Sequence, residues 1–385
     1  MRLLTIGCGH IGSIMARYLS ESIPSAEIVV SDTLLDRAEQ VVVSIGRDNL
    51  RAVQLEVSNY DRLIDLLNGV DLAIGLAPGR LGFLSMKACI DAGVDMVDLS
   101  YMSEDPLTLH HSALKKGVTV IPDCGFAPGL SNILVGKAVS MLDHVESVRI
   151  FVGGLPEKNI PPLGYKVTWC VEDLIEEYVR VSLIVENGKK IEVRALDGIE
   201  MVEIPNIGLL EAFYTDGVRT LHHTIKGVNS MWEKTMRYPG HAEKIKMLME
   251  LGFFDETPIL LDRGFKISPR ELTIKLFEKR LSMFDLKDLV AMKIEVDGIK
   301  DGQGTRYTYH MLDLFDEEKQ ITAMARTTAY TASIIVELLL KGVIKEKGVV
   351  PPENLGMSSV VEDILNELKL KGIEVSEFKT QSLAS

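Results

Sequence analysis

The sequence predicts an α/β protein: an N-terminal doubly wound parallel sheet completed by C-terminal helices, with an inserted α+β region that carries an antiparallel sheet. Two observations predict this fold. Over residues 1–125, short apolar runs alternate with amphipathic stretches of about ten residues, a pattern typical of a parallel sheet covered by helices on both faces. From residue 146 the strand candidates lie further apart, and Asn187-Gly188 is typical of a type I′ hairpin turn.

The expected elements follow in order along the chain. In the N-terminal part we expect buried strands at residues 3–6, 28–30, 72–74, 96–98 and 118–121, and helices at 11–19, 60–67 and 83–92. In the inserted region we expect strands at residues 148–152, 183–186, 191–193, 293–296 and 307–314, and helices at 171–178, 232–251 and 269–279.

The C-terminal part is expected to be helical. Apolar residues recur on one side of residues 322–343, which predicts a helix, and residues 360–370 predict a last one. Pro351-Pro352 forces an extended segment between them, and the polar residues after Lys379 are expected to fray. The predicted domains are therefore residues 1–125 with 322–385, and residues 126–321.

The composition excludes several classes of protein. With 42 basic and 55 acidic residues the formal net charge is −13, which argues against a nucleic-acid or anionic-membrane surface. The four cysteines form no CxxC pair, so we expect neither a disulfide scaffold nor a metal site. No apolar run approaches the ~18 residues of a membrane span, and no signal-peptide pattern opens the chain. We expect a cytoplasmic protein.

The strongest motif is a glycine-rich turn between the first strand and the first helix. Gly7, Gly9 and Gly12 form a GxGxxG pattern, in which the glycines permit a tight turn, close approach to a pyrophosphate and close packing of the helix. Asp32 ends the second strand, where a carboxylate binds ribose hydroxyls and repels a 2′-phosphate. The motif predicts a dinucleotide site that prefers NAD over NADP.

Other cofactor contacts are expected near the glycine loop and at the carboxyl ends of the remaining parallel strands. Ligands of doubly wound sheets bind at that edge. Ordinary turn chemistry remains an alternative for each residue taken alone. The further predicted cofactor-binding residues are His10, Ile11, Thr33, Ser58, Ala77, Pro78 and Ser100.

Several segments resemble the saccharopine dehydrogenase-related family, and the match is closest to its L-lysine 6-dehydrogenases. The segments that carry the resemblance include Asp98-Leu99-Ser100-Tyr101, the run from Asp123 to Asn132, and Arg237-Tyr238-Pro239-Gly240-His241. The resemblance extends over nearly the whole chain. It implies a Rossmann domain, a central substrate domain, and NAD-dependent oxidation of the ε-amine of lysine to 2-aminoadipate 6-semialdehyde, which cyclises to piperideine-6-carboxylate.

One departure separates branches of that family. Saccharopine reductases carry a carboxylate before the proline of the segment that corresponds to residues 125–129, and here Ala127 stands at that place. This difference weighs against a saccharopine-type substrate, although it does not establish lysine.

Amine oxidation requires a group that moves a proton and activates water, and histidine is the natural candidate near neutral pH. His241 follows a Pro-Gly turn and opens a predicted helix, so it is the leading candidate, with a purely structural helix-cap role as the alternative. Tyr101 and Asp123 lie at the ends of predicted parallel strands and complete the predicted catalytic set. His222-His223 is a second possibility.

An amino-acid substrate also presents a carboxylate, for which arginine is the best bidentate partner. Arg219 and Arg237 lie in predicted turns of the second domain, where an ordinary ion pair is the alternative. Tyr238 and Thr168, from segments that resemble the same family, complete the predicted substrate-binding set.

Two alternatives to an amine dehydrogenase stay open. One is an imine reductase of the saccharopine or carboxynorspermidine type, and the other is a non-catalytic dinucleotide-binding protein. As partners we expect a small amino acid or amine, no nucleic acid and no membrane. A homodimer is expected because twofold dimers are the commonest assemblies.

Overall fold

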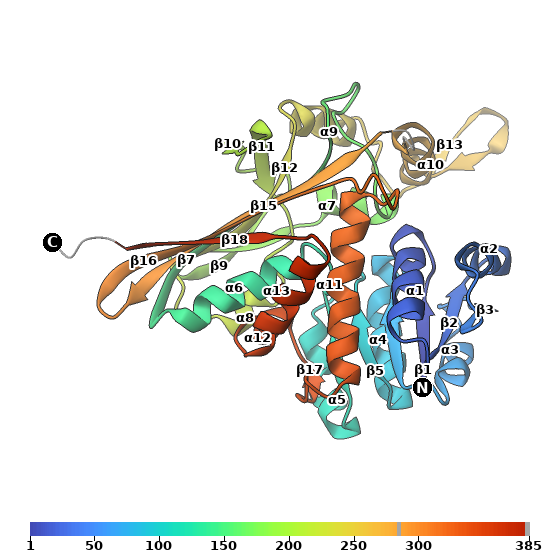
Figure 1. The fold of residues 1–385 in the computed structure, drawn as a ribbon. Coiled ribbons are helices and arrows are strands. Elements are labelled where there is room, and N and C mark those ends of the chain that lie inside the picture. Colours follow the sequence, from blue (N-terminus) through green and yellow to red (C-terminus); the bar gives the residue numbers. More distant parts are fainter. Residues whose placement is uncertain (283–285, 382–385) are drawn as a thin grey trace. The chain divides into compact units, whose positions relative to one another are not determined.

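The computed structural model describes residues 1–282 and 286–381 (Figure 1). These residues divide into two compact units: unit 1 comprises residues 1–141 and 325–374, and unit 2 comprises residues 142–324 and those from 375 on. The predicted α/β class is confirmed, with a parallel sheet in unit 1 and a mixed sheet in unit 2.

Unit 1 is built on a seven-stranded parallel sheet in the order β17-β6-β5-β4-β1-β2-β3. The order reverses between β1 and β4, so the sheet is doubly wound, with a switch point beside the first strand. Its strands are β1 (Arg2–Ile6), β2 (Glu27–Asp32), β3 (Leu50–Gln54), β4 (Leu72–Gly75), β5 (Asp95–Asp98), β6 (Thr119–Ile121) and β17 (Gly348–Val349).

Helices cover this sheet. They are α1 (His10–Ser22), α2 (Leu35–Ile45), α3 (Tyr60–Leu67), α4 (Gly79–Ala92), α5 (His110–Lys116), α6 (Leu130–Met141), α11 (Ala323–Leu340), α12 (Pro352–Gly356) and α13 (Val360–Leu370), with a 3-10 turn over Pro106–Leu109. Helices α3, α4 and α5 contribute to one apolar cluster with the strands. Helices α1 and α11 lie side by side, with the Tyr18 and Tyr330 ring centroids 5.2 Å apart (Figure 1).

The two unit boundaries differ from the predicted domain boundaries. Helix α6, which the sequence analysis did not predict, belongs to unit 1 because it packs closely on α12. A Cβ on Gly136 would lie 2.1 Å from the Glu353 carbonyl oxygen, and one on Gly356 would lie 1.9 Å from that of Ile133.

The C-terminal boundary also differs from the prediction. Strand β18 (Val375–Gln381) belongs to unit 2, where it pairs with β16. Gln381 is therefore paired rather than frayed, and residues 382–385 lie outside the described residues.

Unit 2 is built on a nine-stranded sheet whose main order is β10-β11-β12-β7-β15-β16-β18, with β8 paired to β12 and β9 to β8. All of these pairs are antiparallel except β7 with β12, so the expected antiparallel sheet contains one parallel pair. The strands are β7 (His144–Pro156), β8 (Ser182–Glu186), β9 (Lys189–Val193), β10 (Glu200–Ile204), β11 (Gly208–Tyr214), β12 (Ser230–Arg237), β15 (Asp288–Lys300), β16 (Gln303–Leu314) and β18.

The remaining elements of unit 2 are α7 (Val171–Val179), α8 (Leu221–Thr224), α9 (His241–Glu250), α10 (Pro269–Leu281), the small hairpin of β13 (Ile259–Leu260) and β14 (Lys266–Ile267), and a 3-10 turn over Asp262–Gly264. The predicted hairpin turn is confirmed, because Asn187 and Gly188 join β8 to β9 with φ of 51° and 73°.

The predicted helix over residues 232–251 is wrong in its first part. Residues up to Arg237 belong to β12, which pairs with both β7 and β11 and so gains a ladder of hydrogen bonds on each side. Gly240, with φ of 88°, then turns the chain, and α9 begins at His241. Glu211 of β11 accepts hydrogen bonds from the N–H groups of Gly240 at 2.7 Å and Ala242 at 2.6 Å, which fixes the start of the helix.

Candidate active site

Two of the three glycines in the loop of unit 1, Gly7 and Gly12, leave no room for a side chain. Gly7 has φ of 110°, and a Cβ there would lie 2.7 Å from the Leu76 carbonyl oxygen. A Cβ on Gly12 would lie 2.7 Å from the carbonyl oxygen of Gly7. A Cβ on Gly9, in contrast, would meet nothing within 4 Å. The loop is therefore packed against the protein at Gly7 and Gly12 and open at Gly9, where a pyrophosphate would approach.

The N-terminus of α1 suits an anion. Gly9 precedes the helix and supplies no side-chain cap, and the first turn contains no acidic residue. The first N–H groups of the helix have no partner within the helix, and the helix dipole adds partial positive charge there. His10 is exposed and Ile11 half-buried at the start of this helix, and their contact with a cofactor stays a prediction.

Asp32 ends β2 next to the glycine loop and is buried. Its Oδ2 accepts a hydrogen bond from the backbone N–H of Cys8 at 3.4 Å, and its Oδ1 accepts from the N–H of Leu34 at 3.1 Å. The Cys8 thiol also donates to Asp32, and burial raises the pKa of that thiol to about 12, so it stays neutral. Asp32 is thus held as an acceptor at the edge of the loop.

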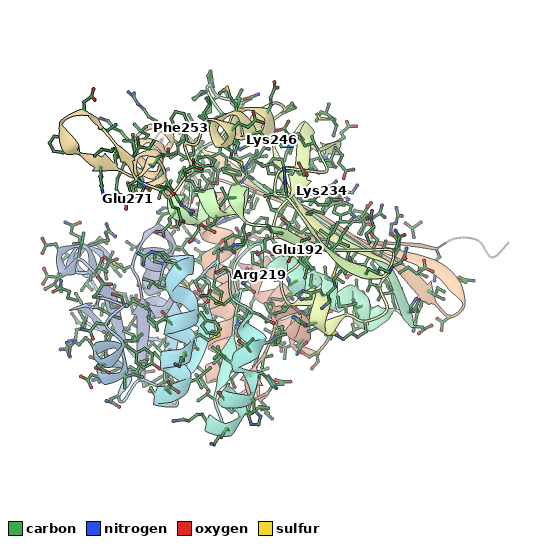
Figure 2. The ribbon with its side chains drawn as sticks, turned by 180° about the vertical axis from the view of Figure 1, so that it is seen from behind. Glu192, Arg219, Lys234, Lys246, Phe253 and Glu271 are labelled. Carbon is green, nitrogen blue, oxygen red and sulfur yellow. The ribbon has the colours of Figure 1, made fainter. Side chains whose placement is uncertain are left out.

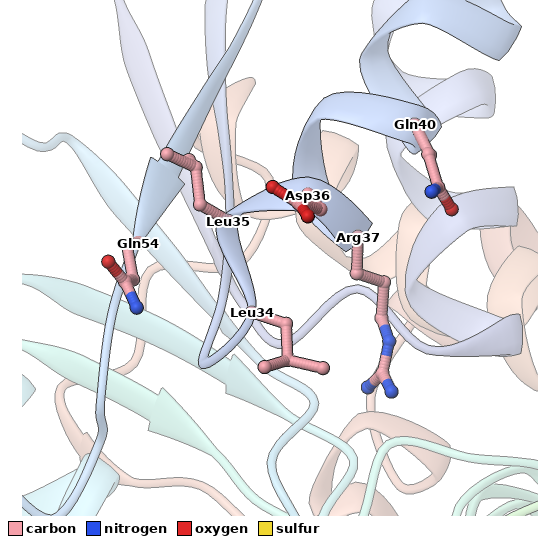
Figure 3. A pocket seen from close by; sticks show the side chains of 6 residues that line it. All are labelled: Leu34, Leu35, Asp36, Arg37, Gln40 and Gln54. Atoms are coloured by element: carbon pink, nitrogen blue, oxygen red, sulfur yellow. The ribbon is translucent and has the colours of Figure 1, made fainter.

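A hollow of about 500 Å³ opens beside Asp32, lined by Leu34, Leu35, Asp36, Arg37, Gln40 and Gln54 (Figure 3). Arg37, half-exposed at this hollow, lies 3.4 Å from the Oδ1 of Asp32. The Gln54 amide donates to the carbonyl oxygen of Thr33 at 3.0 Å, which ties the end of β3 to the end of β2. This hollow lies where a nucleoside would follow a pyrophosphate at Gly9.

The other predicted residues of unit 1 lie after β3, β4, β5 and β6. Ala77 is buried and Pro78 half-buried after β4, and Ser58 is exposed and donates to Glu56 at 2.9 Å. Ser100 is buried, and its hydroxyl donates to Asp98 at 2.5 Å. Because these strands are parallel, their carboxyl ends meet at the edge that carries the glycine loop.

Tyr101 and Asp123 lie at the same edge. Tyr101 is half-buried two residues after Leu99, whose N–H donates to the carbonyl oxygen of Gly75. Asp123 is 1% exposed and has φ of 52°, a conformation that is uncommon outside glycine and that aspartate tolerates better than most residues. Strained backbone of this kind concentrates at functional sites.

The loop after Asp123 is closed on itself. The Gly125 N–H donates to the Pro128 carbonyl oxygen at 3.1 Å, and a Cβ on Gly129 would lie 2.1 Å from the Gly125 carbonyl oxygen. Asn132 is fully buried behind this loop. Its Oδ1 accepts from the Gly129 N–H at 3.3 Å, while its amide nitrogen has no hydrogen-bond partner among the residues that the structure describes.

In unit 2 a buried ion pair joins α7 to β12. One Arg237 nitrogen lies 3.1 and 3.0 Å from the two carboxylate oxygens of Glu177, and the guanidinium stacks on the Tyr165 ring with its carbon 4.6 Å from the centroid. Arg237 is only 3% exposed. Its charged partner and the ring that it stacks on both belong to unit 2.

Glu233 lies two residues before Thr235 on the same face of β12, and it is almost fully buried. Its Oε2 accepts a hydrogen bond from the Thr215 hydroxyl at 2.6 Å, and Thr215 also lies 2.8 Å from the Thr235 hydroxyl. Burial is the main cause that raises the pKa of Glu233 to about 8, and the neighbouring Glu177 and Asp216 carboxylates add to it. This carboxyl keeps its proton near neutral pH.

Arg219 lies in the loop before α8 with φ of 51° (Figure 2). Its guanidinium is 3.3 Å from the Oδ2 of Asp216, and Arg180 approaches the same oxygen at 3.5 Å. Thr168 is buried, and the Tyr238 hydroxyl donates to the Pro156 carbonyl oxygen at 2.9 Å. The predicted substrate-binding arginines thus both belong to networks with carboxylates of unit 2.

His241 is completely buried at the start of α9. Its Nδ1 lies 2.9 Å from the Leu163 carbonyl oxygen and its Nε2 lies 2.9 Å from the Tyr178 hydroxyl. The first contact requires a proton on Nδ1, so Nε2 accepts from the tyrosine. Burial, and next the charge of Arg237, lower the pKa of His241 to about 3, so the ring is neutral near pH 7.

Family models match both parts of the chain. Residues 125–373 match the saccharopine dehydrogenase C-terminal domain, and residues 3–121 match the saccharopine dehydrogenase NADP binding domain. The chain belongs to the saccharopine dehydrogenase family. The predicted resemblance is thereby confirmed at the level of the family, and unit 1 contains the pyridine-nucleotide-binding domain of that family.

Curated relatives share low identity over long stretches. The α-aminoadipic semialdehyde synthase of Rattus norvegicus is 23% identical over 99% of this chain and 48% of its own length. A saccharopine dehydrogenase [NADP(+), L-glutamate-forming] of Pyricularia oryzae is 22% identical over 97% of this chain and 98% of its own. The carboxyaminopropylagmatine dehydrogenase of a Synechocystis species is 22% identical over 92% of each. The chain spans about half the length of the rat relative.

A solved structure shows the same fold. Saccharopine dehydrogenase (L-Glu forming) of Saccharomyces cerevisiae matches with a TM-score of 0.79 and 21% identity, covering 98% of this chain and 99% of that one. At this identity the match supports the fold alone.

The sequence analysis missed four residues that the structure brings into these clusters: Glu177, Thr215, Glu233 and Asn132. Asn132 lies in a segment that resembles the family, so the resemblance contained a signal for it. Glu233, Thr235 and Arg237 alternate along one strand, and that period of two marks a single polar face. The predicted helix over this stretch concealed it.

The described part of the chain shows neither a cluster of metal-binding side chains nor a membrane-spanning helix. Over residues 1–282 and 286–381, no group of three or more histidine, cysteine or acidic residues is placed to hold a metal ion. Within the same ranges, no helix is both long and apolar enough to cross a membrane.

Proposed function

We propose that this member of the saccharopine dehydrogenase family is an NAD-dependent oxidoreductase that oxidatively deaminates the ε-amine of L-lysine. The product is 2-aminoadipate 6-semialdehyde, which cyclises to piperideine-6-carboxylate. The observation that carries the NAD-dependent part of the proposal is Asp32, a buried acceptor beside an open Gly9 and a helix N-terminus without a cap, whereas lysine as the substrate rests on the resemblance. These residues fit a dinucleotide, which supplies the hydride acceptor when it is bound.

The preference for NAD rests on charge. A hydrogen bond from a ribose hydroxyl to a carboxylate contributes about 1.5–3 kcal/mol, whereas a 2′-phosphate would meet like charge at Asp32. The name of the matched domain and of the Pyricularia relative points to NADP instead. A 2′-phosphate would meet Arg37, a basic residue that lines the hollow and already lies against Asp32.

The cofactor proposal is tested by titrating NADH and NADPH against the purified protein and an Asp32→Ser variant. We expect tighter binding of NADH by the wild type, a roughly 10- to 150-fold loss of NADH affinity in the variant, and a gain for NADPH as Arg37 is released. Asp36→Ser, in the same hollow, is the matched control and should change neither affinity by more than about twofold. Equal or tighter binding of NADPH by the wild type would refute NAD preference.

The reaction requires a balanced set of transfers. A hydride leaves the ε-carbon of the substrate, a proton leaves its nitrogen, water adds to the resulting imine carbon, and ammonia departs. In this proposal Tyr101 donates a hydrogen bond to the substrate and Asp123 orients the ammonium group or the water. Both follow parallel strands at the edge of the glycine loop, which is where ligands of such sheets bind.

The proposal keeps unit 2 as the unit that recognises an amino acid. Arg219 and Arg237 are assigned to the substrate carboxylate, with Tyr238 and Thr168 beside them. Glu233 is assigned to a cationic amine, because a buried carboxyl that keeps a proton near neutral pH can release it in exchange for an ammonium group. A substrate carboxylate at these arginines would share each guanidinium with a carboxylate of unit 2, Asp216 at Arg219 or Glu177 at Arg237.

The role of His241 in this proposal differs from the one expected from the sequence. Both ring nitrogens are hydrogen-bonded, and a pKa of about 3 makes the imidazole a poor base near pH 7. We therefore assign His241 to positioning Tyr178 and the Leu163 backbone. A His241→Gln variant should lower kcat without moving the pH profile, whereas a catalytic base at this position would shift or abolish its acidic limb.

The reaction is tested by following reduction of NAD and NADP with a panel that contains L-lysine, other amino acids, diamines and saccharopine. Turnover with lysine supports the proposal. Turnover with saccharopine, or with the substrates of the Synechocystis relative, instead supports the second candidate, an imine reductase acting on secondary amines, which the names of the relatives favour. Nucleotide binding without any turnover would indicate a non-catalytic protein.

A further inference from the structure

One carboxylate oxygen of unit 2 is shared by two largely buried arginines that come from different elements. The Oδ2 of Asp216 lies 3.3 Å from Arg219, in the loop before α8, and 3.5 Å from Arg180, which directly follows α7. The side chains of Arg219 and Arg180 are only 5% and 12% exposed. Two guanidinium groups this close repel each other unless an anion lies between them, and the repulsion is stronger away from water.

The contacts of Asp216 are longer than those of the ion pair between Glu177 and Arg237. Strong hydrogen bonds between guanidinium and carboxylate groups are about 2.7–2.9 Å long. Both oxygens of Glu177 accept from Arg237, at 3.1 and 3.0 Å, whereas Asp216 offers a single oxygen to its two arginines at 3.3 and 3.5 Å. A carboxylate with one oxygen at each guanidinium would therefore bind the two arginines better than Asp216 does.

The loop that carries Asp216 is held in an unfavourable conformation. The Gly217 N–H donates to the Thr215 carbonyl oxygen at 3.0 Å, which closes a three-residue turn, and Arg219 has φ of 51°. A Cβ on Gly217 would lie 2.5 Å from the carboxyl carbon of Glu233, so the loop packs directly on that carboxyl. Positive φ at a residue with a side chain is uncommon and concentrates at ligand-binding sites. The strain at Arg219 is therefore consistent with a ligand site beside Asp216.

The surroundings of Asp216 allow its carboxylate to leave. Its side chain is 15% exposed, which is more than either arginine, so it reaches water most easily of the three. Arg180 keeps a second carboxylate, Glu176 four residues earlier on α7, at 3.7 Å. This contact limits the movement of the Arg180 guanidinium when Asp216 moves away. An incoming anion therefore meets two guanidinium groups that are already in place, which lowers the cost of binding it.

We propose that Asp216 occupies the place of the substrate carboxylate, and that Arg180 and Arg219 together bind that carboxylate once Asp216 is displaced. The inference rests on the proposed function in so far as the substrate is an amino acid, and it adds Arg180 to the substrate-binding residues. A ligand carboxylate offers one oxygen to each guanidinium and so replaces the single shared oxygen of Asp216. An amine without a carboxylate leaves Asp216 in place, so the exchange selects amino acids over simple diamines.

Rescue of an Asp216→Ala variant by acetate tests the site without any substrate. Thermal unfolding of the full chain is followed by the fluorescence of Trp169 and Trp232, which both belong to unit 2. In sodium chloride the variant should unfold at a lower temperature than the wild type, because two buried arginines lose an anion. In sodium acetate of equal concentration its midpoint should rise by roughly 2–4 °C, and that of the wild type by less than about 1 °C.

Two further variants control this experiment. Asp197, half-exposed in another loop of unit 2, pairs with Lys246 alone at 3.0 Å, so Asp197→Ala should show no more response to acetate than the wild type (Figure 2). Adding Arg180→Met to Asp216→Ala should abolish the rescue. Equal midpoints in acetate and chloride for Asp216→Ala overturn the proposal, and so does a rescue that survives the loss of Arg180.

Steady-state kinetics test the exchange itself. Asp216→Asn keeps the size of the side chain but not its charge, so it should lower the KM of the carboxylate substrate that turns over, L-lysine or saccharopine, by roughly 5- to 30-fold. Arg180→Met should raise that KM by a similar factor and change kcat by less than about threefold. Inhibition by cadaverine, which is lysine without its carboxyl group, should change by less than about twofold in both variants. A KM that is unchanged or higher in Asp216→Asn overturns the proposal.

The two experiments separate this inference from the reaction proposed above. Rescue by acetate without turnover of lysine supports the carboxylate site and contradicts the proposed reaction. Turnover of lysine without rescue supports the reaction and overturns the role assigned to Asp216.

Discussion

The buried carboxyl of Glu233 should make the stability of unit 2 fall as the pH rises, and glutamine at this position should remove that dependence. Burial raises the pKa of Glu233 from 4.5 to about 8. The folded state therefore keeps a proton that the unfolded chain releases, and folding stability decreases with pH between these two values. At 1.36 kcal/mol per pKa unit, the full loss above about pH 8 is roughly 3–5 kcal/mol.

Glu233→Gln keeps the shape of the side chain and the acceptor for the Thr215 hydroxyl but cannot ionise. Near pH 5, where Glu233 is protonated in the folded state, we expect the variant and the wild type to differ by less than about 1 kcal/mol. Near pH 9 the variant should be more stable by roughly 3–5 kcal/mol. The predicted effect is a stabilising substitution that appears only at alkaline pH.

Tryptophan fluorescence during denaturation by urea measures this effect in unit 2. The chain has two tryptophans, Trp169 and Trp232, and both belong to unit 2. Glu177→Gln is the control, because it leaves the buried Arg237 charge without its carboxylate and should destabilise the unit at every pH. Free energies of unfolding that fall in parallel for wild type and Glu233→Gln would refute the reasoning, since the pH dependence would then come from another group.

Three further predictions follow from local geometry. Gly12→Ala should destabilise unit 1 by about 1–3 kcal/mol in thermal circular dichroism, because its Cβ meets backbone, whereas Gly9→Ala should preserve stability and weaken NADH binding in a titration. Arg237→Met should cost roughly 3–5 kcal/mol in urea, and adding Glu177→Gln should recover part of it, unlike two independent substitutions. Asp288→Ala removes the acceptor for the first N–H groups of α11 and should cost about 1–2 kcal/mol, with Asp288→Asn costing less.

The parallel sheet and the glycine loop could be predicted because local patterns specify them. Each strand of unit 1 is a short apolar run, and Gly7, Gly9, Gly12 and Asp32 occur at spacings that one turn and one strand impose. Helix α6 was missed for the opposite reason. It is apolar on nearly all sides, so it lacks the one-sided period that identifies a surface helix, and its contact with α12 through Gly136 is long-range in sequence.

The clusters of unit 2 could not be predicted because burial and partners are properties of the fold. A sequence shows that Arg237 is an arginine beside a turn, but the Glu177 carboxylate that neutralises it lies 60 residues away on another element. The same holds for His241, whose type suggests a base near neutral pH until its burial is known. The segments that carry the resemblance contain both residues, and the structure adds the burial and the partners of each side chain.

Each face of β12 combines apolar packing with buried polar groups. On one face Trp232 and Met236 contact an apolar cluster with Phe151, and Lys234 between them is buried and paired with Glu200. On the other face Glu233 and Arg237 are buried beside the apolar Met231. Burying polar and charged groups costs free energy, and apolar residues of similar volume would be at least as stable. Residues that break such a rule are expected at functional sites, so the face of β12 with Glu233 and Arg237 is where unit 2 would recognise a polar ligand.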